Sequence, residues 1–224
     1  MLSLLTDTSP DSEQRRIVPV KDDLFTPEIK SLRRDLGTLA LACADALTKT
    51  AQHYAGEDLW AIGTMPGYGP LADSVESVCR GFLANSHLSA PHTEIVSNTL
   101  KMSGDLRTAA RGARQAVQIA FLFRADRDAG TDALQLLAPM ADAVVAVAER
   151  TAFAVQTGDP ATATQAAHAY RAVDALRIEV EWCIRTHQWD AYFSPTLQRM
   201  VRASAWNFAV AGEGMARVAA RLIA

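Results

Sequence analysis

The feature that most constrains the fold is a long helical pattern between residues 98 and 123, which recurs about one hundred residues further along the chain. In the first copy, small or apolar residues recur at steps of three and four and so form one face of an α-helix: Leu100, Leu106, Ala109, Ala113, Ala116, Val117 and Ala120. Residues 197–223 have the same character, with Ala, Gly and helically spaced Arg. Small side chains on a buried face let helix axes approach closely, so the pattern is typical of a helical bundle.

Two further landmarks keep nearly the same period. Gly56-Glu57-Asp58 corresponds to Gly158-Asp159-Pro160, and Val75-Glu76 corresponds to Val173-Asp174. A fixed internal period indicates that one structural unit occurs twice. We therefore predict an all-α fold of six helices, arranged as two tandem antiparallel three-helix bundles.

The two predicted units cover residues 25–124 and 132–224, and residues 1–24 form a polar, proline-containing arm that we expect to be flexible. The composition agrees with a helical fold, because alanine is abundant, aromatic residues make up only 7% of the chain, and strand-like alternation is scarce. A formal net charge of −3 gives no general attraction to nucleic acid, so no such partner is expected.

Local signals place the helix ends. Thr26 and Pro27 suit the N-cap and the first position of the first helix, and Asp159 and Pro160 suit the same roles later in the chain. Pro70 and its neighbouring glycines predict an interruption before the second helix. The expected helices run to about Gly56, from about 71 to 86, from the turn at 89–91 to 124, from 132 to 157, from 160 to 188, and from 197 to the C-terminus.

Cysteine usage and hydropathy indicate a soluble cytoplasmic protein. Cys43, Cys79 and Cys183 are widely separated, odd in number and set in helical patterns, so we expect reduced, buried thiols. The N-terminal residues lack a basic segment, a long apolar core and a cleavage site, so they do not resemble a signal peptide. No uncharged apolar run has the length that a membrane span needs, so no membrane insertion is expected.

Common catalytic and metal-binding motifs are absent from the sequence. The sequence contains no Glu-x-x-His pair, no histidines four residues apart, no Cys-x-x-Cys, no phosphate-binding loop and no Gly-x-Ser-x-Gly. One aromatic cluster is either packing under a turn or a ligand platform: Trp182, His187, Trp189, Tyr192 and Phe193. In an enzymatic alternative, His187 acts as a general base with Asp190 as its partner.

Three arginines share one arc of the central helix. Arg107, Arg111 and Arg114 follow the spacing i, i+4 and i+7, and like charges at that spacing repel unless something anionic lies opposite. The anionic groups opposite the arginines are, in one interpretation, acidic residues of the same chain such as Glu179 and Glu181. The other is an anion or an acidic partner surface that docks on the arginines.

The period, the three helices per unit, the Gly-Asp turn and the segments KMSGDL, AVQIA and MARVAARLI resemble PhoU, the phosphate uptake regulator, over roughly residues 25–224. The resemblance implies three-helix bundles and, in relatives, a metal-binding Glu/Asp-x-x-x-Asp motif. Matching KMSGDL makes Asp105 the Asp ahead of the motif and puts Arg107 and Arg111 at the acidic positions. Matching AVQIA puts Ala110 and Arg114 there instead.

In the second unit, the matching positions hold Ala209 and Glu213, so one acid of four survives. A cationic side chain at a ligand position repels a metal ion, so we expect no metal cluster and no other cofactor.

By resemblance, the protein is a cytoplasmic, non-enzymatic regulator of phosphate uptake and phosphate signalling. Its implied partners are the ATPase of a phosphate ABC transporter and a sensor kinase, and its implied assembly is a homodimer. Arg107, Arg111 and Arg114 are the expected partner-binding residues. The alternatives are a PhoU-like helical scaffold unrelated to phosphate and, from another class, the enzyme built around His187.

Overall fold

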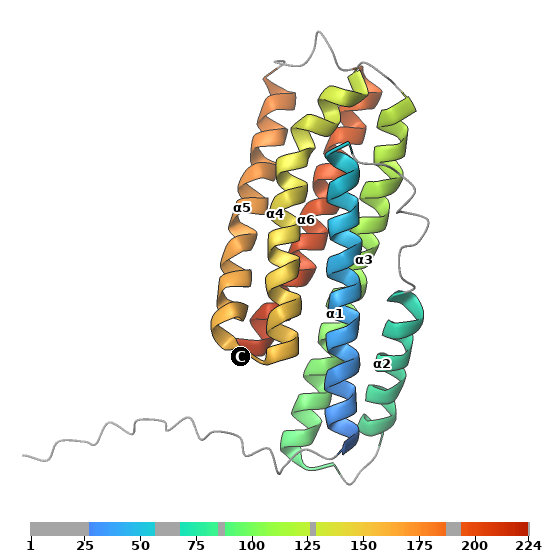
Figure 1. The fold of residues 1–224 in the computed structure, drawn as a ribbon, viewed down its shortest axis with the longest axis vertical. Coiled ribbons are helices and arrows are strands. Elements are labelled where there is room, and N and C mark those ends of the chain that lie inside the picture. The colour runs from blue at the N-terminus through green and yellow to red at the C-terminus, as the bar shows by residue number, and fades with distance from the viewer. Residues whose placement is uncertain (1–26, 57–67, 85–87, 126–128, 187–193, 224) are drawn as a thin grey trace, which may run out of the picture.

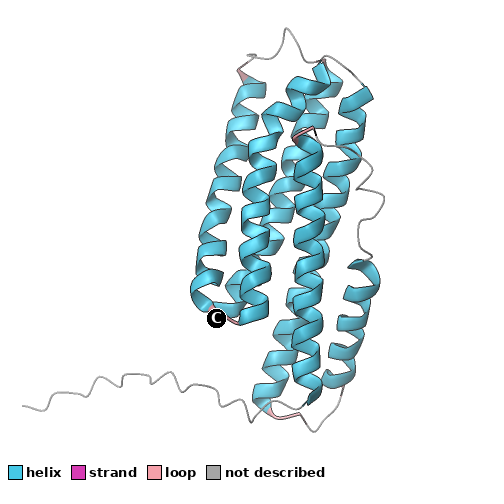
Figure 2. Cartoon of the chain, viewed as in Figure 1, coloured by secondary structure: helices cyan, strands magenta, loops and turns pink. Residues whose placement is uncertain are grey.

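The computed structural model describes residues 27–56, 68–84, 88–125, 129–186 and 194–223. Within these ranges every regular element is an α-helix, which confirms the predicted all-α fold (Figures 1 and 2). The helices are α1 (Pro27–Tyr54), α2 (Tyr68–Leu83), α3 (Ala90–Ala125), α4 (Ala129–Thr157), α5 (Pro160–Arg185) and α6 (Pro195–Ile223). The predicted arm at residues 1–24 lies outside the described residues.

Several helix ends differ from the sequence-based expectation. Helix α2 begins at Tyr68 rather than near Leu71, because Pro70 falls in the first turn, where a missing backbone N–H breaks no helical hydrogen bond. Helix α4 begins at Ala129, three residues before the expected Asp132. The cap of α5 is as predicted: the Asp159 carboxylate accepts hydrogen bonds from the backbone N–H groups of Ala161 and Thr162, both at 3.1 Å.

The helices form one long bundle with four central members. Among the central helices, α1 and α6 each contact both α3 and α4, and α3 contacts α4; α2 packs on α1 and α3, and α5 packs on α4 and α6 (Figure 1). Figure 1 shows α1 antiparallel to α4 and α3 antiparallel to α6. Each three-helix set is also in mutual contact, so the central four helices join the two sets face to face.

The main hydrophobic core is shared by the two sets. Its fully buried side chains include Leu39 of α1, Leu106 of α3, Leu137 of α4 and Phe208 of α6. The buried hydroxyl of Tyr54 adds a polar link, because it donates to the carbonyl of Ala116 at 2.9 Å and lies 2.9 Å from the Ser204 hydroxyl. One side chain thereby connects α1, α3 and α6.

The most extensive helix contact is between α3 and α6, and two glycines allow it. A Cβ atom on Gly112 would lie 2.7 Å from the carbonyl oxygen of Asn207, and a Cβ atom on Gly214 would lie 2.8 Å from that of Asp105. Each helix therefore contributes one glycine to the place where the opposing backbone comes closest. This arrangement explains the Ala- and Gly-rich faces of both patterns.

The turns after α1 and α4 are built alike. Gly56 follows α1 with φ of 95°, and Gly158 follows α4 with φ of 69°. Both lie in the left-handed region, which glycine adopts at little cost. These glycines are corresponding landmarks of the internal repeat.

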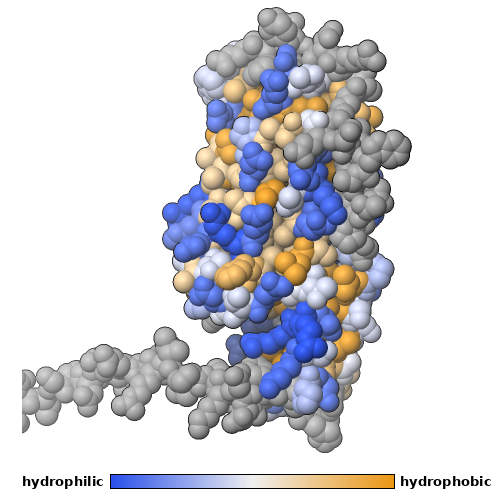
Figure 3. Space-filling model, in the orientation of Figure 1, coloured by the Kyte–Doolittle hydropathy of each residue, from blue (hydrophilic) through white to orange (hydrophobic). Residues whose placement is uncertain are grey.

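Among the described helices, one has the length and hydropathy of a membrane span: Gly130–Thr157, in which an 18-residue window has a mean hydropathy of 1.3. This segment is most of α4, which contacts α1, α3, α5 and α6. Its apolar character therefore fits a core helix. The surface in Figure 3 mixes polar and apolar residues, and the densest hydrophilic area on that face lies over the N-terminal part of α1.

Candidate functional site

The two residues predicted as remnants of a metal motif lie at the same place in the fold. Asp105 of α3 accepts hydrogen bonds from Arg217 Nε at 3.0 Å and from Arg221 Nε at 2.9 Å, both on α6. Arg217 also donates from Nη1 to Glu213 at 2.8 Å. We call these four residues the α3–α6 junction. Its central group is a guanidinium held between two carboxylates.

The junction does not suit a metal cluster. The Asp105 side chain is only 13% exposed, and both of its carboxylate oxygens already bind arginine. Hard cations need several oxygen ligands, whereas here a positive side chain occupies the space between the two acids. Among the described residues, no three His, Cys, Asp or Glu side chains come together as metal ligands.

Sequence reasoning missed Arg217 and Arg221 as parts of this junction. Arg217 follows Glu213 by four residues, which is a recognisable ion-pair spacing within a helix. Nothing in the local sequence indicates that Arg217 and Arg221 also reach Asp105 on another helix.

Arg107, the first of the three predicted partner-binding arginines, binds acidic residues of α2. Its guanidinium lies 2.7 Å from Asp73 and 2.9 Å from Glu76. The hydrogen bond to Asp73 is the main reason that the pKa of Arg107 is raised above its ordinary value. The suggestion of Glu181 as an intramolecular partner was wrong, because Glu181 lies near Arg185 and Arg202 instead.

The other two arginines lie exposed on the same side of α3. Arg114 places its guanidinium carbon 5.4 Å from the centre of the Tyr68 ring, which is a cation–π distance. Arg111 lies between Arg107 and Arg114 on the helix and is exposed. The three residues therefore flank the contact between α2 and α3, and we call this surface the α2–α3 arginine face.

The alternative enzymatic site falls largely on residues that the structure does not describe. His187, Trp189, Asp190, Tyr192 and Phe193 are all outside the described ranges. Trp182 belongs to α5, and its side chain is exposed. The proposed pairing of His187 with Asp190 is therefore left as a prediction from sequence.

All three cysteines are free thiols, and two are buried as expected. Burial raises the pKa of the Cys43 thiol to about 12 and that of Cys79 to about 11, so neither is a reactive thiolate near neutral pH. Cys183 differs from the expectation, because it is only partly buried. It lies on the outer helix α5.

Together, the fold and the junction define a class of protein, an all-α chain of two three-helix sets. The last helix of each set, α3 or α6, packs closely against the other at Gly112 and Gly214. No protein-family model and no curated protein matches the sequence. Among solved structures, the chain is similar to PhoU from Pseudomonas aeruginosa, with a TM-score of 0.74 and 12% sequence identity. The likeness covers 88% of this chain and 95% of that one. The chain therefore has a divergent PhoU-like fold.

Proposed function

We propose that this protein regulates phosphate uptake and phosphate signalling by binding other proteins, in the cytoplasm and without catalysing a reaction. The supporting observation is the likeness to PhoU over nearly the whole of both chains. By the same reasoning, its partners are the ATPase of a phosphate ABC transporter and a sensor kinase, and it assembles as a homodimer.

The α2–α3 arginine face is the proposed contact surface. Arg111 and Arg114 are exposed, and arginine binds carboxylates through paired, directional hydrogen bonds. Arg107 helps to form the surface in a different way, because its bonds to Asp73 and Glu76 fix α2 against α3. The partner should therefore carry acidic residues at the docking position.

A genetic experiment tests the link with phosphate. Deleting the gene in the native host should raise alkaline phosphatase output and alter phosphate uptake when phosphate is abundant. A deletion strain with unchanged responses would favour the alternative, a PhoU-like scaffold unrelated to phosphate.

A binding experiment tests the proposed surface. The Arg111→Glu variant and the native protein are used to capture partners from lysate of the native host, with Arg171→Glu on α5 as a control of the same charge change. We expect the transporter ATPase or the kinase to be recovered with the native and control proteins and lost with Arg111→Glu. Equal recovery by all three would remove this face from the proposal.

A further inference from the structure

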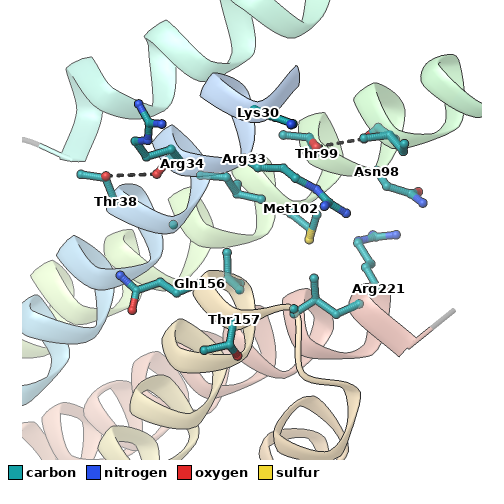
Figure 4. A pocket seen from close by; sticks show the side chains of 16 residues that line it. Lys30, Arg33, Arg34, Thr38, Asn98, Thr99, Met102, Gln156, Thr157 and Arg221 are labelled. Atoms are coloured by element: carbon teal, nitrogen blue, oxygen red, sulfur yellow. Dashed lines mark hydrogen bonds between the residues drawn. The ribbon is translucent and has the colours of Figure 1, made fainter. Parts of the chain in front are cut away.

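The structure contains a pocket of about 550 Å³ that is separate from the α2–α3 arginine face. Four helices line it: the N-terminal half of α1, part of α3, the C-terminal end of α4 and the last turn of α6 (Figure 4). This volume is within the range of sites that bind small molecules. The pocket lies beside the α3–α6 junction, because Arg221 belongs to both.

The lining is strongly basic. Four lining residues are cationic, namely Lys30, Arg33, Arg34 and Arg221, and none of the described lining residues is acidic. In Figure 4, the side chains of Arg33, Asn98 and Arg221 extend toward one another, while Arg34 extends the opposite way. The pocket therefore has one side on which several donors converge.

The Arg221 side chain is fixed at the edge of the pocket by its hydrogen bond to Asp105. Its Nε donates to Asp105 at 2.9 Å, and a guanidinium has further Nη donors. The bond to Asp105 fixes the side chain, so less conformational freedom remains to be lost when a ligand binds.

The basic group on α1 has no counterpart on the corresponding helix of the second unit. Lys30 lies in the first turn of α1, where the helix dipole disfavours positive side chains, and Arg33 and Arg34 lie in the second turn. At the spacing between Gly56 and Gly158, the corresponding residues of α4 are Asp132, Gln135 and Leu136. The second unit thus forms the corresponding helix without this basic group.

The rest of the lining mixes apolar residues with polar ones, the latter being Thr38, Asn98, Thr99, Gln156 and Thr157. Leu36, Met102, Val155 and Leu222 contribute apolar surface, and Gly37 lies among them within α1. Glycine in a helix interior is less favourable than alanine, and any larger side chain here would extend into the pocket. The glycine keeps this space available.

We propose that the pocket binds a small organic phosphate that carries more than one negative charge. A phosphoryl group matches the arginine fork and brings two or more negative charges to the side of the pocket where Lys30, Arg33 and Arg221 lie, whereas a carboxylate brings only one. Lys30, Arg33, Asn98 and Arg221 hold the phosphoryl oxygens. The organic part lies against Met102, Val155 and Leu222.

The test is isothermal titration calorimetry on the full chain with ATP, adenosine and orthophosphate as probes, without divalent metal. We expect ATP to bind at least about ten-fold more tightly than adenosine or orthophosphate, because only ATP offers both phosphoryl charge and an organic body. The Arg33→Glu variant should weaken ATP binding by about ten-fold or more, while Arg171→Glu should change it less than about two-fold.

A second variant separates loss of binding from loss of folding. Gly37→Leu should abolish ATP binding by filling the pocket, and circular dichroism with a cooperative thermal melt would show that the variant is folded; the nearest atom to a Cβ at Gly37 is Gln156 Cγ, at an ordinary 3.5 Å. The proposal is overturned if ATP does not bind, if orthophosphate binds as tightly, if Arg33→Glu resembles Arg171→Glu, or if folded Gly37→Leu still binds ATP. Arg111→Glu should leave ATP binding unchanged, so the result does not depend on the proposed function.

Discussion

Asp105 links α3 to α6 through hydrogen bonds from Arg217 and Arg221. Its two oxygens accept from two different arginines, and water reaches little of the side chain. Charge-assisted hydrogen bonds in such partly buried places are stronger than those between fully exposed ions. Removing the carboxylate would also leave two guanidinium groups close together.

We therefore expect Asp105→Asn to lower the free energy of unfolding by about 1–3 kcal/mol, measured by urea denaturation. Asp174→Asn is the matched control, because Asp174 pairs with Arg177 three residues along the same helix and is 46% exposed. That change should lower the free energy of unfolding by less than about 0.5 kcal/mol. Equal destabilisation by the two variants would show that the junction contributes no more than a surface ion pair.

The arginines show which part of a site can be predicted from sequence. Helical spacing predicted that Arg107, Arg111 and Arg114 share one side of α3, and the structure places them together beside α2. The partners of Arg107 were not predicted, because Asp73 and Glu76 come from another helix. Spacing along a chain describes one helix, whereas contacts between helices depend on how their axes are rotated and offset.

The pocket was missed for the same physical reason. Its lining comes from the ends and middles of four helices, and none of those segments carries a recognisable ligand-binding motif. The helices themselves were predictable, because apolar periodicity and caps such as Asp159 are local signals. The start of α2 was placed too late because proline was treated as a helix breaker, although the first turn accommodates it.

At the scale of helices, the close contact between α3 and α6 depends on two glycines, which have no side chain to separate the backbones. Gly112→Ala and Gly214→Ala should each lower the free energy of unfolding by about 1–3 kcal/mol, because the new Cβ meets backbone that cannot move aside alone. Gly104→Ala is the control within α3, since nothing lies within 4 Å of a Cβ there. It should instead raise stability by about 0.4–1 kcal/mol.

Chemical denaturation of the three variants would measure this difference. If Gly112→Ala and Gly214→Ala were as stable as Gly104→Ala, the close approach of α3 and α6 would be refuted.

The start of α5 should make stability depend on pH. Hydrogen bonds from the Thr162 side chain and from the backbone N–H groups of Ala161 and Thr162 lower the pKa of Asp159. A lowered pKa in the folded state means that the contribution is complete above the unfolded pKa of about 3.9 and is lost as pH falls through the folded value. Asp159→Ala should therefore lower the melting temperature at pH 7, and the difference should shrink below about pH 4.

Thermal melts of the native protein and Asp159→Ala between pH 3 and pH 7 would measure the effect. Asp142→Ala, at an exposed position in the interior of α4, provides the comparison. A deficit for Asp159→Ala that persisted unchanged at pH 3 would argue against a carboxylate cap.

At the scale of the whole molecule, the repeat creates two units that are incomplete alone. The buried faces of α1 and α3 are covered by α4 and α6, and the main core draws residues from both sets. The same helices that define each unit in the sequence therefore join it to the other. A sequence period of this kind marks the repeated unit, while the shared core decides what unfolds together.

We expect the full chain to unfold in one transition that circular dichroism and tryptophan fluorescence report identically, because separating the sets would expose both faces of the shared core. A fragment of residues 1–126 should lack a cooperative melt alone and regain one when mixed with residues 127–224, since the α3–α6 and α1–α4 contacts can then form. Replacing Gly112 by Leu in the first fragment should prevent this recovery, because a large side chain would meet the backbone of α6. Two separate melting transitions in the full chain, or a fragment that melts cooperatively alone, would mean that the units are independent domains and that the shared core contributes little.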